Sequence, residues 1–236
     1  MKYRFASYAG ALLLLQGLSA CSDENKVANA AETSAAPSDN MAANAAEASD
    51  TRLVVAFGDS LYAGYGVLPQ QSFPARLEQA LVAGGVAAVV RNAGVSGDTS
   101  AAGRRRLAFT LDGLDRKPDL VMVNLGGNDM LRGIDPAETR ANLTAICEEL
   151  KRREIPILLT GMVAAPNLGS DYAARFNPIY PDLAKRYDAA LYPFFLDGVV
   201  LDRTLMLPDH IHPNPAGIDA IVRKVAPMVT RSLKGD

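Results

Sequence analysis

The sequence predicts an α/β fold, a three-layer α/β/α sandwich with a central, mostly parallel, five-stranded sheet. Two observations carry this prediction. From residue 52 onward, short apolar runs alternate with amphipathic segments, which is the pattern of strand–helix–strand units. The apolar runs are continuous and lack polar alternation, as expected for strands of a parallel sheet that is covered on both faces.

Five apolar runs are the predicted strands. They are 53–57, 86–90, 119–125, 155–162 and the weaker run 191–195. Their lengths of five to eight residues fit strands better than buried helices. Amphipathic segments separate them, so each pair of successive strands can be joined by a crossover helix.

Two helices are marked by both their caps and their apolar stripes. In 135–153, Asp135 can cap the helix and Pro136 fits its first turn. The stripe there is Leu143, Ile146, Cys147 and Leu150. Asn214 repeats the cap for the last helix, whose stripe is Ile218, Ile221, Val222 and Val225. We expect Pro227 to kink or interrupt that helix, because proline lacks the N–H of the helical ladder.

Composition fits one ordinary globular domain without a nucleic-acid partner. The chain has 236 residues and a formal net charge of -2, which gives no strong field for a polyanion. The only dense basic run is Arg104-Arg105-Arg106, which we interpret as a solvated helix face. Cys21 and Cys147 are the only cysteines, and Cys147 lies on the apolar stripe of 135–153, where a buried inert thiol is expected.

The N-terminus carries an export pattern. Lys2 and Arg4 precede the apolar stretch 10–18, which is short for a bilayer span. The following "LSAC" resembles the signal of bacterial lipoproteins, which implies removal of 1–20 and acylation of Cys21. An ordinary secretory signal cut near Ala20 is the alternative. Serine rather than aspartate follows the cysteine, so we expect the outer membrane, facing the periplasm, if the source is Gram-negative.

A tether separates this signal from the fold. Residues 21–51 are rich in alanine and acids and have almost no bulky apolar side chains. Such a segment has nothing to bury and is expected to remain a flexible coil, with a reach of roughly 30 Å. The predicted folded domain is therefore 52–236.

Four polar clusters follow the strands or precede the last helix. They are "FGDSLYAGYG" (57–66), "NAGVSGDTS" (92–100), "NLGGNDMLRG" (124–133) and "LPDHIHPN" (207–214). Ligands gather at the carboxyl ends of the strands in such sheets, so we expect these clusters to meet. The pattern G-x-G-x-x-G is missing, and a nucleotide site is not indicated.

Taken together and in this order, the clusters resemble the four motif blocks of the SGNH subgroup of GDSL hydrolases. The resemblance covers nearly all of 52–231. In detail, the sequence is most similar to bacterial periplasmic esterases that act as thioesterases, arylesterases and lysophospholipases. It implies the SGNH hydrolase fold and a catalytic triad of Ser60, His212 and Asp209. It also implies an oxyanion hole formed by the N–H groups of Ser60 and Gly97 and the amide of Asn128.

The pair His210 and His212 admits other interpretations. Two histidines spaced H-x-H can be half of a metal site, but the chain has no third histidine, and no nearby aspartate completes a defensible ligand spacing. They can also be a structural pair. We favour the triad and expect no metal and no cofactor. His210 stands where the family commonly has glycine, so it is a poor candidate for an essential role, and Asp59 is expected to be a structural hydrogen bonder.

The expected substrates are small acyl esters or lysolipids. Loops 130–134 and 162–176 should form the walls of an acyl pocket, with Ala164 and Ala165 leaving room. We expect hydrolysis of carboxylic esters, with acyl thioesters as a side activity. An O-deacetylase of envelope glycans is the alternative enzyme, and a lipid-anchored binding module on an inactive scaffold is the non-enzymatic alternative. We expect a monomer that contacts the membrane only through Cys21.

Overall fold

The computed structural model describes residues 51–235. Five strands form one sheet in the order β2-β1-β3-β4-β5, and each neighbouring pair is parallel. The strands are β1 (Arg52–Gly58), β2 (Ala88–Gly94), β3 (Leu120–Asn124), β4 (Ile157–Thr160) and β5 (Ala190–Tyr192). The predicted class and the five predicted strands are thereby confirmed.

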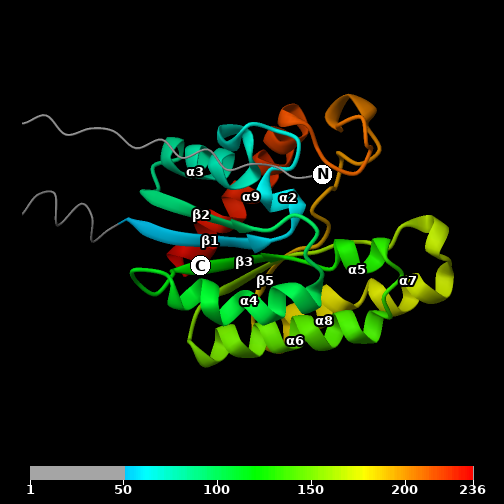
Figure 1. Cartoon of the computed structure of the whole chain (residues 1–236). Helices are drawn as coiled ribbons and strands as arrows, with labels where there is room; N and C mark the ends of the chain where they lie inside the picture. The colour runs from blue at the N-terminus through cyan, green and yellow to red at the C-terminus, as the bar shows by residue number, and fades with distance from the viewer. Residues whose placement is uncertain (1–50, 236) are drawn as a thin grey trace, which may run out of the picture.

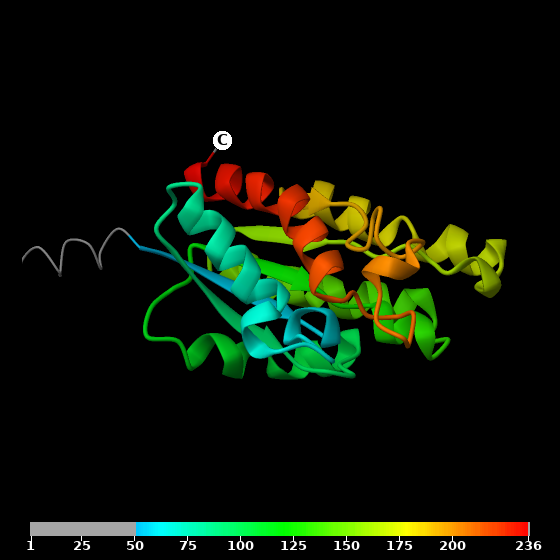
Figure 2. The ribbon, with the colours of Figure 1, turned by 90° about the horizontal axis from the view of Figure 1, so that it is seen from above.

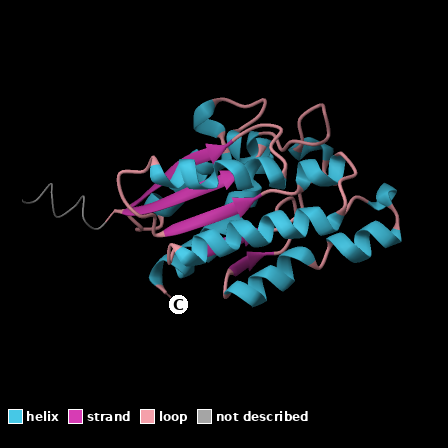
Figure 3. Cartoon of the chain, turned by 60° about the horizontal axis from the view of Figure 1, so that its bottom comes forward, coloured by secondary structure: helices cyan, strands magenta, loops and turns pink. Residues whose placement is uncertain are grey.

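Helices cover both faces of the sheet, which makes the three layers (Figure 1). One face carries α2 (Ser60–Ala63), α3 (Phe73–Ala83) and α9 (Pro215–Lys234). The other carries α4 (Ser100–Asp112), α6 (Pro136–Arg152) and α8 (Ile179–Tyr187). Figure 2 shows α3 and α9 lying over the sheet, and Figure 3 shows α6 and α8 on the opposite side. The short helices α5 (Gly127–Leu131) and α7 (Ser170–Phe176) lie beyond the carboxyl edge.

Strand ends differ from prediction where local chemistry intervenes. The second strand begins at Ala88 and continues to Gly94, because its last residues pair with the end of β1. The fifth strand stops at Tyr192. Pro193 follows it and has no N–H for the ladder. The next residues turn back, and the Phe195 N–H donates to the Gly161 carbonyl at 2.8 Å.

The predicted helix caps and stripes are confirmed. Asp135 accepts from the Ala137 N–H at 2.9 Å, and Asn214 accepts from the Gly217 N–H at 3.1 Å. Every residue of the two predicted stripes is buried, including the Cys147 thiol, whose pKa burial raises to about 12. Of the two effects expected at Pro227, a kink or an interruption, the interruption is wrong, because α9 runs through Pro227 to Lys234.

The N-terminal predictions concern residues outside the described part. The signal 1–20, Cys21 and the tether up to residue 50 are not described. None of the helices within 51–235 combines the length and apolar character that crossing a bilayer requires. The chain enters the domain at Arg52, at the amino edge of the sheet, whereas the polar clusters lie at the carboxyl edge (Figure 1).

Candidate active site

Ser60 is the first residue of α2, directly after the sharp turn that follows β1. Asp59 caps this short helix, because its Oδ1 accepts a hydrogen bond from the Leu61 N–H at 3.0 Å. Gly58 precedes the turn, and a Cβ there would come within 2.7 Å of the Asn124 carbonyl on β3. The turn therefore needs glycine at this position, and it presents Ser60 to a pocket at the carboxyl edge.

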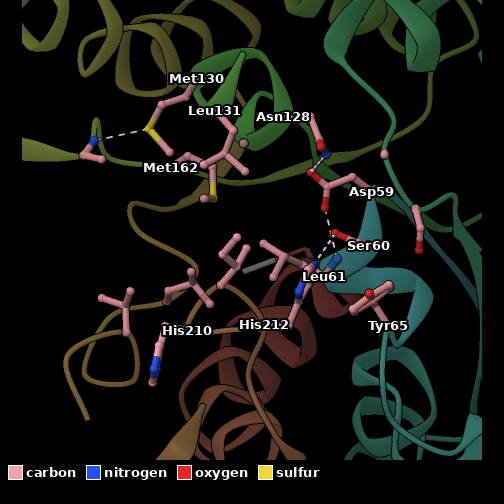
Figure 4. Close-up of a pocket in the computed structure, with 17 residues that line it drawn as sticks. Asp59, Ser60, Leu61, Tyr65, Asn128, Met130, Leu131, Met162, His210 and His212 are labelled. Carbon is pink, nitrogen blue, oxygen red and sulfur yellow. Dashed lines mark hydrogen bonds between the residues drawn. The ribbon is translucent and has the colours of Figure 1, made fainter. Parts of the chain in front are cut away.

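A continuous chain of hydrogen bonds joins Ser60, His212 and Asp209. Figure 4 shows its first part, with the His212 ring beside Ser60. The distance from Ser60 Oγ to His212 Nε2 is 2.8 Å, and that from His212 Nδ1 to Asp209 Oδ2 is 2.7 Å. Both ring nitrogens are thereby engaged. This is the arrangement in which a histidine can take a proton from a serine while a carboxylate fixes its tautomer.

The loop 207–214 holds its own acid and base together. The Leu207 N–H donates to the His212 carbonyl at 2.8 Å and closes the loop. Asp209 Oδ1 accepts the N–H groups of Ile211 and His212, both at 3.0 Å. Burial raises the pKa of Asp209, but the hydrogen bonds from the His212 ring and these two N–H groups outweigh it and lower the pKa to about 2. Asp209 is therefore an anion throughout the neutral range.

Gly97 and Asn128 line the same pocket as Ser60. Gly97 is in a turn closed by a hydrogen bond from the Asp98 N–H to the Val95 carbonyl at 3.1 Å, with φ +85°. Within residues 51–235, no protein acceptor takes the N–H of Ser60 or of Gly97. These donors and the Asn128 amide are available to an anionic oxygen, as an oxyanion hole requires.

Asp59 is a second carboxylate beside the serine, and it is only 2% exposed. Its Oδ2 accepts a hydrogen bond from Asn128 Nδ2 at 3.1 Å. Burial raises its pKa to about 6, against the opposing effect of the hydrogen bonds from Leu61 and Asn128. This hydrogen bond specifies the structural role predicted for Asp59, which is to orient the side-chain amide of Asn128.

The pocket has a volume of about 470 Å³ and apolar walls. The two expected loops contribute Met130, Leu131, Met162 and Ala165, as predicted, whereas Ala164 is buried and does not line it. A third wall was not predicted. It comes from the segment after β5 and from the triad loop, and it consists of Leu196, Val200 and Ile211.

Tyr65 is a site residue that the sequence pattern did not single out. Its ring lies 4.4 Å from the His212 ring, centroid to centroid, at an interplanar angle of 34°. It also lines the pocket and is half exposed. Tyr65 lies in the motif "GDSLYAGYG", shortly after Ser60, and this position could have indicated a place near the site. Nothing in the sequence shows that its ring packs against His212.

The predicted solvated face at Arg104–Arg106 is wrong for Arg106. Its side chain is only 20% exposed, and its Nε donates to Asp98 Oδ2 at 2.6 Å. Its Nη2 donates to the Gly58 carbonyl at 2.9 Å, and the guanidinium lies 4.1 Å from the Phe57 ring centroid. Arg106 therefore ties the serine turn to the Gly97 turn, while Arg104 and Arg105 are exposed.

His210 lies at the rim of the pocket with φ +56°. This left-handed conformation is one that glycine adopts freely and that other residues adopt less often. Its ring has no hydrogen-bond partner among residues 51–235. Across that same stretch, no group of three or more His, Cys, Asp or Glu side chains could hold a metal ion.

Comparisons with known proteins agree on one family. The model of the GDSL-like lipase/acylhydrolase family matches residues 56–220. Esterase TesA of Pseudomonas aeruginosa is 39% identical over 180 residues, covering 76% of this chain and 88% of that protein. Thioesterase 1/protease 1/lysophospholipase L1 of Escherichia coli K12 is 38% identical over 186 residues, covering 77% and 86%. The crystal structure of AlinE4, an SGNH-hydrolase family esterase, is 52% identical with a TM-score of 0.67, covering 78% and 97%.

Proposed function

This chain belongs to the GDSL-like lipase/acylhydrolase family, and we propose that it is a serine esterase that cleaves carboxylic esters through Ser60, His212 and Asp209. Acyl thioesters are its side substrates. The observation that carries the proposal is the unbroken hydrogen-bond chain from Ser60 Oγ through both nitrogens of His212 to Asp209.

In the first half of the reaction, Ser60 Oγ attacks the ester carbonyl while His212 Nε2 takes its proton. The negative oxygen of the tetrahedral intermediate accepts hydrogen bonds from the N–H groups of Ser60 and Gly97 and from the Asn128 amide. Asp209, ionised at neutral pH, stabilises the imidazolium. His212 then gives the proton to the departing alkoxide, and the carbonyl–oxygen bond breaks to leave an acyl-enzyme.

In the second half, a water molecule replaces the alcohol. His212 takes a proton from the water, whose oxygen attacks the acyl carbon. The intermediate collapses, the bond to Ser60 Oγ breaks, and the proton returns to Ser60. The same groups cleave a thioester, because only the leaving atom changes from oxygen to sulfur.

The pocket favours an acyl chain as the group that is bound. Its walls are largely leucine, valine, isoleucine and methionine side chains, and methionine adapts to variable shapes. Esters with medium acyl chains and lysolipids fit such walls. An O-deacetylase that binds a glycan would need polar groups for the sugar hydroxyls, and the walls offer few. An inactive binding scaffold would not need a serine, histidine and aspartate held in working geometry.

A fluorophosphonate probe tests the nucleophile. We expect one adduct on the active domain, located on Ser60 by peptide mass spectrometry, and loss of that adduct in Ser60→Ala. Ser96 lines the same pocket, so Ser96→Ala is the matched control and should label normally. An adduct on Ser96, or turnover that survives Ser60→Ala, would overturn the assignment.

A substrate panel tests the specificity. We expect kcat/KM to rise from acetyl to medium-chain p-nitrophenyl esters, to be measurable for lysophospholipids, and to be lower for acyl thioesters. Acetylated sugars should be poor substrates. A preference for acetylated sugars over all the acyl esters would favour the O-deacetylase instead.

For location, we propose that the protein is an exported lipoprotein, anchored through acylated Cys21 in the outer membrane and facing the periplasm in a Gram-negative cell. The support is the sequence pattern of 10–21 and the polar tether that follows it. The tether would join the domain at Arg52, at the edge of the sheet away from the pocket. Such an anchor would leave the pocket open to substrate.

Membrane fractionation tests this location. A multiply acylated cysteine should hold the full-length protein firmly on membranes, and Cys21→Ser should release it with activity intact. A chain beginning at Thr51 should behave in the same way. If Cys21→Ser stays on membranes after washing with salt and carbonate, the apolar stretch 10–18 is an uncleaved anchor and the lipoprotein proposal fails.

A further inference from the structure

Arg132 reaches from α5 to the turn that carries Gly97. Its Nη2 donates a hydrogen bond to the Gly97 carbonyl at 2.9 Å. Arg132 directly follows the last residue of α5, and its own N–H donates to the Asn128 carbonyl at 3.1 Å. One short helix and its C-cap therefore carry the oxyanion donor Asn128 and a guanidinium that contacts the carbonyl of the other donor residue, Gly97.

The Gly97 turn is one whose N–H direction is easily lost. The turn runs from Val95 to Asp98, with Gly97 as its third residue at φ +85°, as in a type II turn. Type I and type II turns differ in ψ of the second residue and φ of the third. That difference is a rotation of the peptide between them, which contains the Gly97 N–H. A switch of turn type would aim this N–H away from the substrate. Arg132 does not hold this peptide itself. It holds the following one, Gly97–Asp98, by its carbonyl, and so restrains Gly97, the residue whose φ must change in such a switch.

Two neighbouring residues of this turn, Gly97 and Asp98, are held differently. Asp98 is fixed from the protein interior, because Arg106 binds its carboxylate and the Gly58 carbonyl. The Gly97 carbonyl lies on the solvent side, and within residues 51–235 its only hydrogen bond comes from Arg132. Arg132 forms no ion pair with any carboxylate in that part of the chain. Among residues 51–235, the hydrogen bond to the Gly97 carbonyl is therefore the only hydrogen bond or ion pair of this guanidinium.

We propose that Arg132 is a positioning residue that latches the Gly97 turn in the orientation that stabilises the oxyanion. It touches neither the reacting carbonyl nor Ser60, and it acts through the Gly97–Asp98 peptide, which is next to the peptide that carries the donor N–H. This inference rests on the proposed serine mechanism. Because the oxyanion forms in both acylation and deacylation, the latch contributes to both steps.

Loss of the latch should lower kcat and leave KM nearly unchanged. Removing a whole oxyanion donor costs about 10²- to 10³-fold in kcat. Arg132→Ala leaves the donor present but its residue, Gly97, less firmly placed, so we expect a loss of about tenfold. Arg132→Lys keeps a cation that can reach the carbonyl and should recover part of the rate. Arg105→Ala removes an exposed arginine without a partner in 51–235 and is the matched control, with wild-type kinetics expected.

A double-mutant cycle identifies the residue through which Arg132 acts. Gly97→Ala disfavours φ +85° and disrupts the turn directly, so adding Arg132→Ala to it should cause little further loss in kcat. Added to Asn128→Ala, the same change should still cost about tenfold, because the two donors are separate. Multiplicative losses with Gly97→Ala would overturn the latch.

Chemical rescue provides a readout that general destabilisation would not give. Arg132 is exposed, so guanidinium ion at millimolar concentration can enter its place and should restore part of the kcat of Arg132→Ala. Asn128→Ala and Arg105→Ala should gain nothing. Normal kcat in Arg132→Ala, with Ser60 still labelled by a fluorophosphonate, refutes the latch alone. Absence of that label on active wild-type protein refutes the serine mechanism itself.

Discussion

Two aspartates flank the serine–histidine pair, and their surroundings are opposite. Asp59 follows β1 at the carboxyl edge of the sheet. The residue is buried, with 2% exposure, and burial raises its pKa to about 6. Asp209 lies on the loop before α9 with a third of its side chain exposed, and hydrogen bonds lower its pKa to about 2 despite some burial. The comparison shows how one residue type supplies two functions, since donors stabilise one anion and desolvation penalises the other.

The two regions are also built differently. The triad loop satisfies Asp209 with its own N–H groups and with His212, so the acid needs little from the rest of the fold. Asp59 receives its hydrogen bonds from α2 and from Asn128 on α5, so it joins two strand ends. In the proposed mechanism, the charge of Asp209 stabilises the protonated His212. The charge of Asp59, which burial disfavours, orients the Asn128 amide.

The substitution that tests this comparison most strongly is Asp209→Asn. The asparagine amide can donate to His212 Nδ1 and favour the wrong tautomer, so we expect a loss in kcat of about 10³- to 10⁴-fold, as in triads generally. The measurement is kcat and KM with a p-nitrophenyl ester, with the melting temperature as the control for folding. A loss below tenfold would show that Asp209 is not the triad acid.

The donor aimed by Asp59 comes next in size. Asn128→Ala should lower kcat by about 10²-fold with little change in KM, because an oxyanion donor acts mainly in the transition state. Steady-state kinetics on one ester and one thioester check this, and both substrates should lose similarly. If KM rises sharply while kcat holds, Asn128 binds substrate instead.

Asp59→Asn should separate function from stability. The carboxylate that orients Asn128 is replaced by an amide that matches it poorly, so we expect kcat to fall on the order of tenfold. The same change removes a buried charge. At pH 8 the unfolding free energy should rise relative to wild type by about 3 kcal/mol, from a pKa shift of about two units.

The pH dependence fixes the sign of that effect. Between the ordinary pKa of 3.8 and the raised value of about 6, folded Asp59 keeps a proton that the unfolded chain has lost. Wild-type stability therefore falls as pH rises through this window, and the advantage of Asp59→Asn grows from near zero at pH 3.5 to its full size above pH 6. Urea unfolding of both proteins across this range measures it. Asp209 is the counterpart, because its lowered pKa stabilises the fold above pH 3.8 and this stabilisation is lost towards pH 2. A constant difference between wild type and Asp59→Asn would contradict the raised pKa.

The sequence predicted the frame of the molecule more fully than its site. Continuous apolar runs located all five strands, and the caps Asp135 and Asn214 located two helices. The motif order also grouped Ser60, Gly97, Asn128 and His212, which line one pocket, with Asp209, which is hydrogen-bonded to His212. These successes share a cause, because each depends on local pattern or on the order of strands.

What escaped prediction depends on contacts between segments distant in sequence. Arg106 looked like one of three similar arginines, and only the fold brings Asp98 and the Gly58 carbonyl within its reach. The raised pKa of Asp59 needs the burial that the neighbouring strands create. The third pocket wall comes mainly from the segment after β5, which ends at Tyr192, before Pro193. How closely this segment approaches Ser60 depends on the turn after the strand, which the sequence does not show.

The smallest expected effect is that of His210→Gly, and it tests whether the triad loop is as self-contained as the comparison implies. His210 adopts φ +56° between Asp209 and His212, and its N–H donates to the Leu207 carbonyl at 3.0 Å. Glycine keeps that hydrogen bond and relieves a strain of about 1 kcal/mol, but it also gains freedom in the unfolded chain, so the melting temperature should change little. The activity loss should be less than about tenfold, against at least about 10³-fold for His212→Ala. Equal and severe losses for the two variants, with both folds intact by circular dichroism, would mean that the histidines act as a pair, and the metal interpretation would replace the triad.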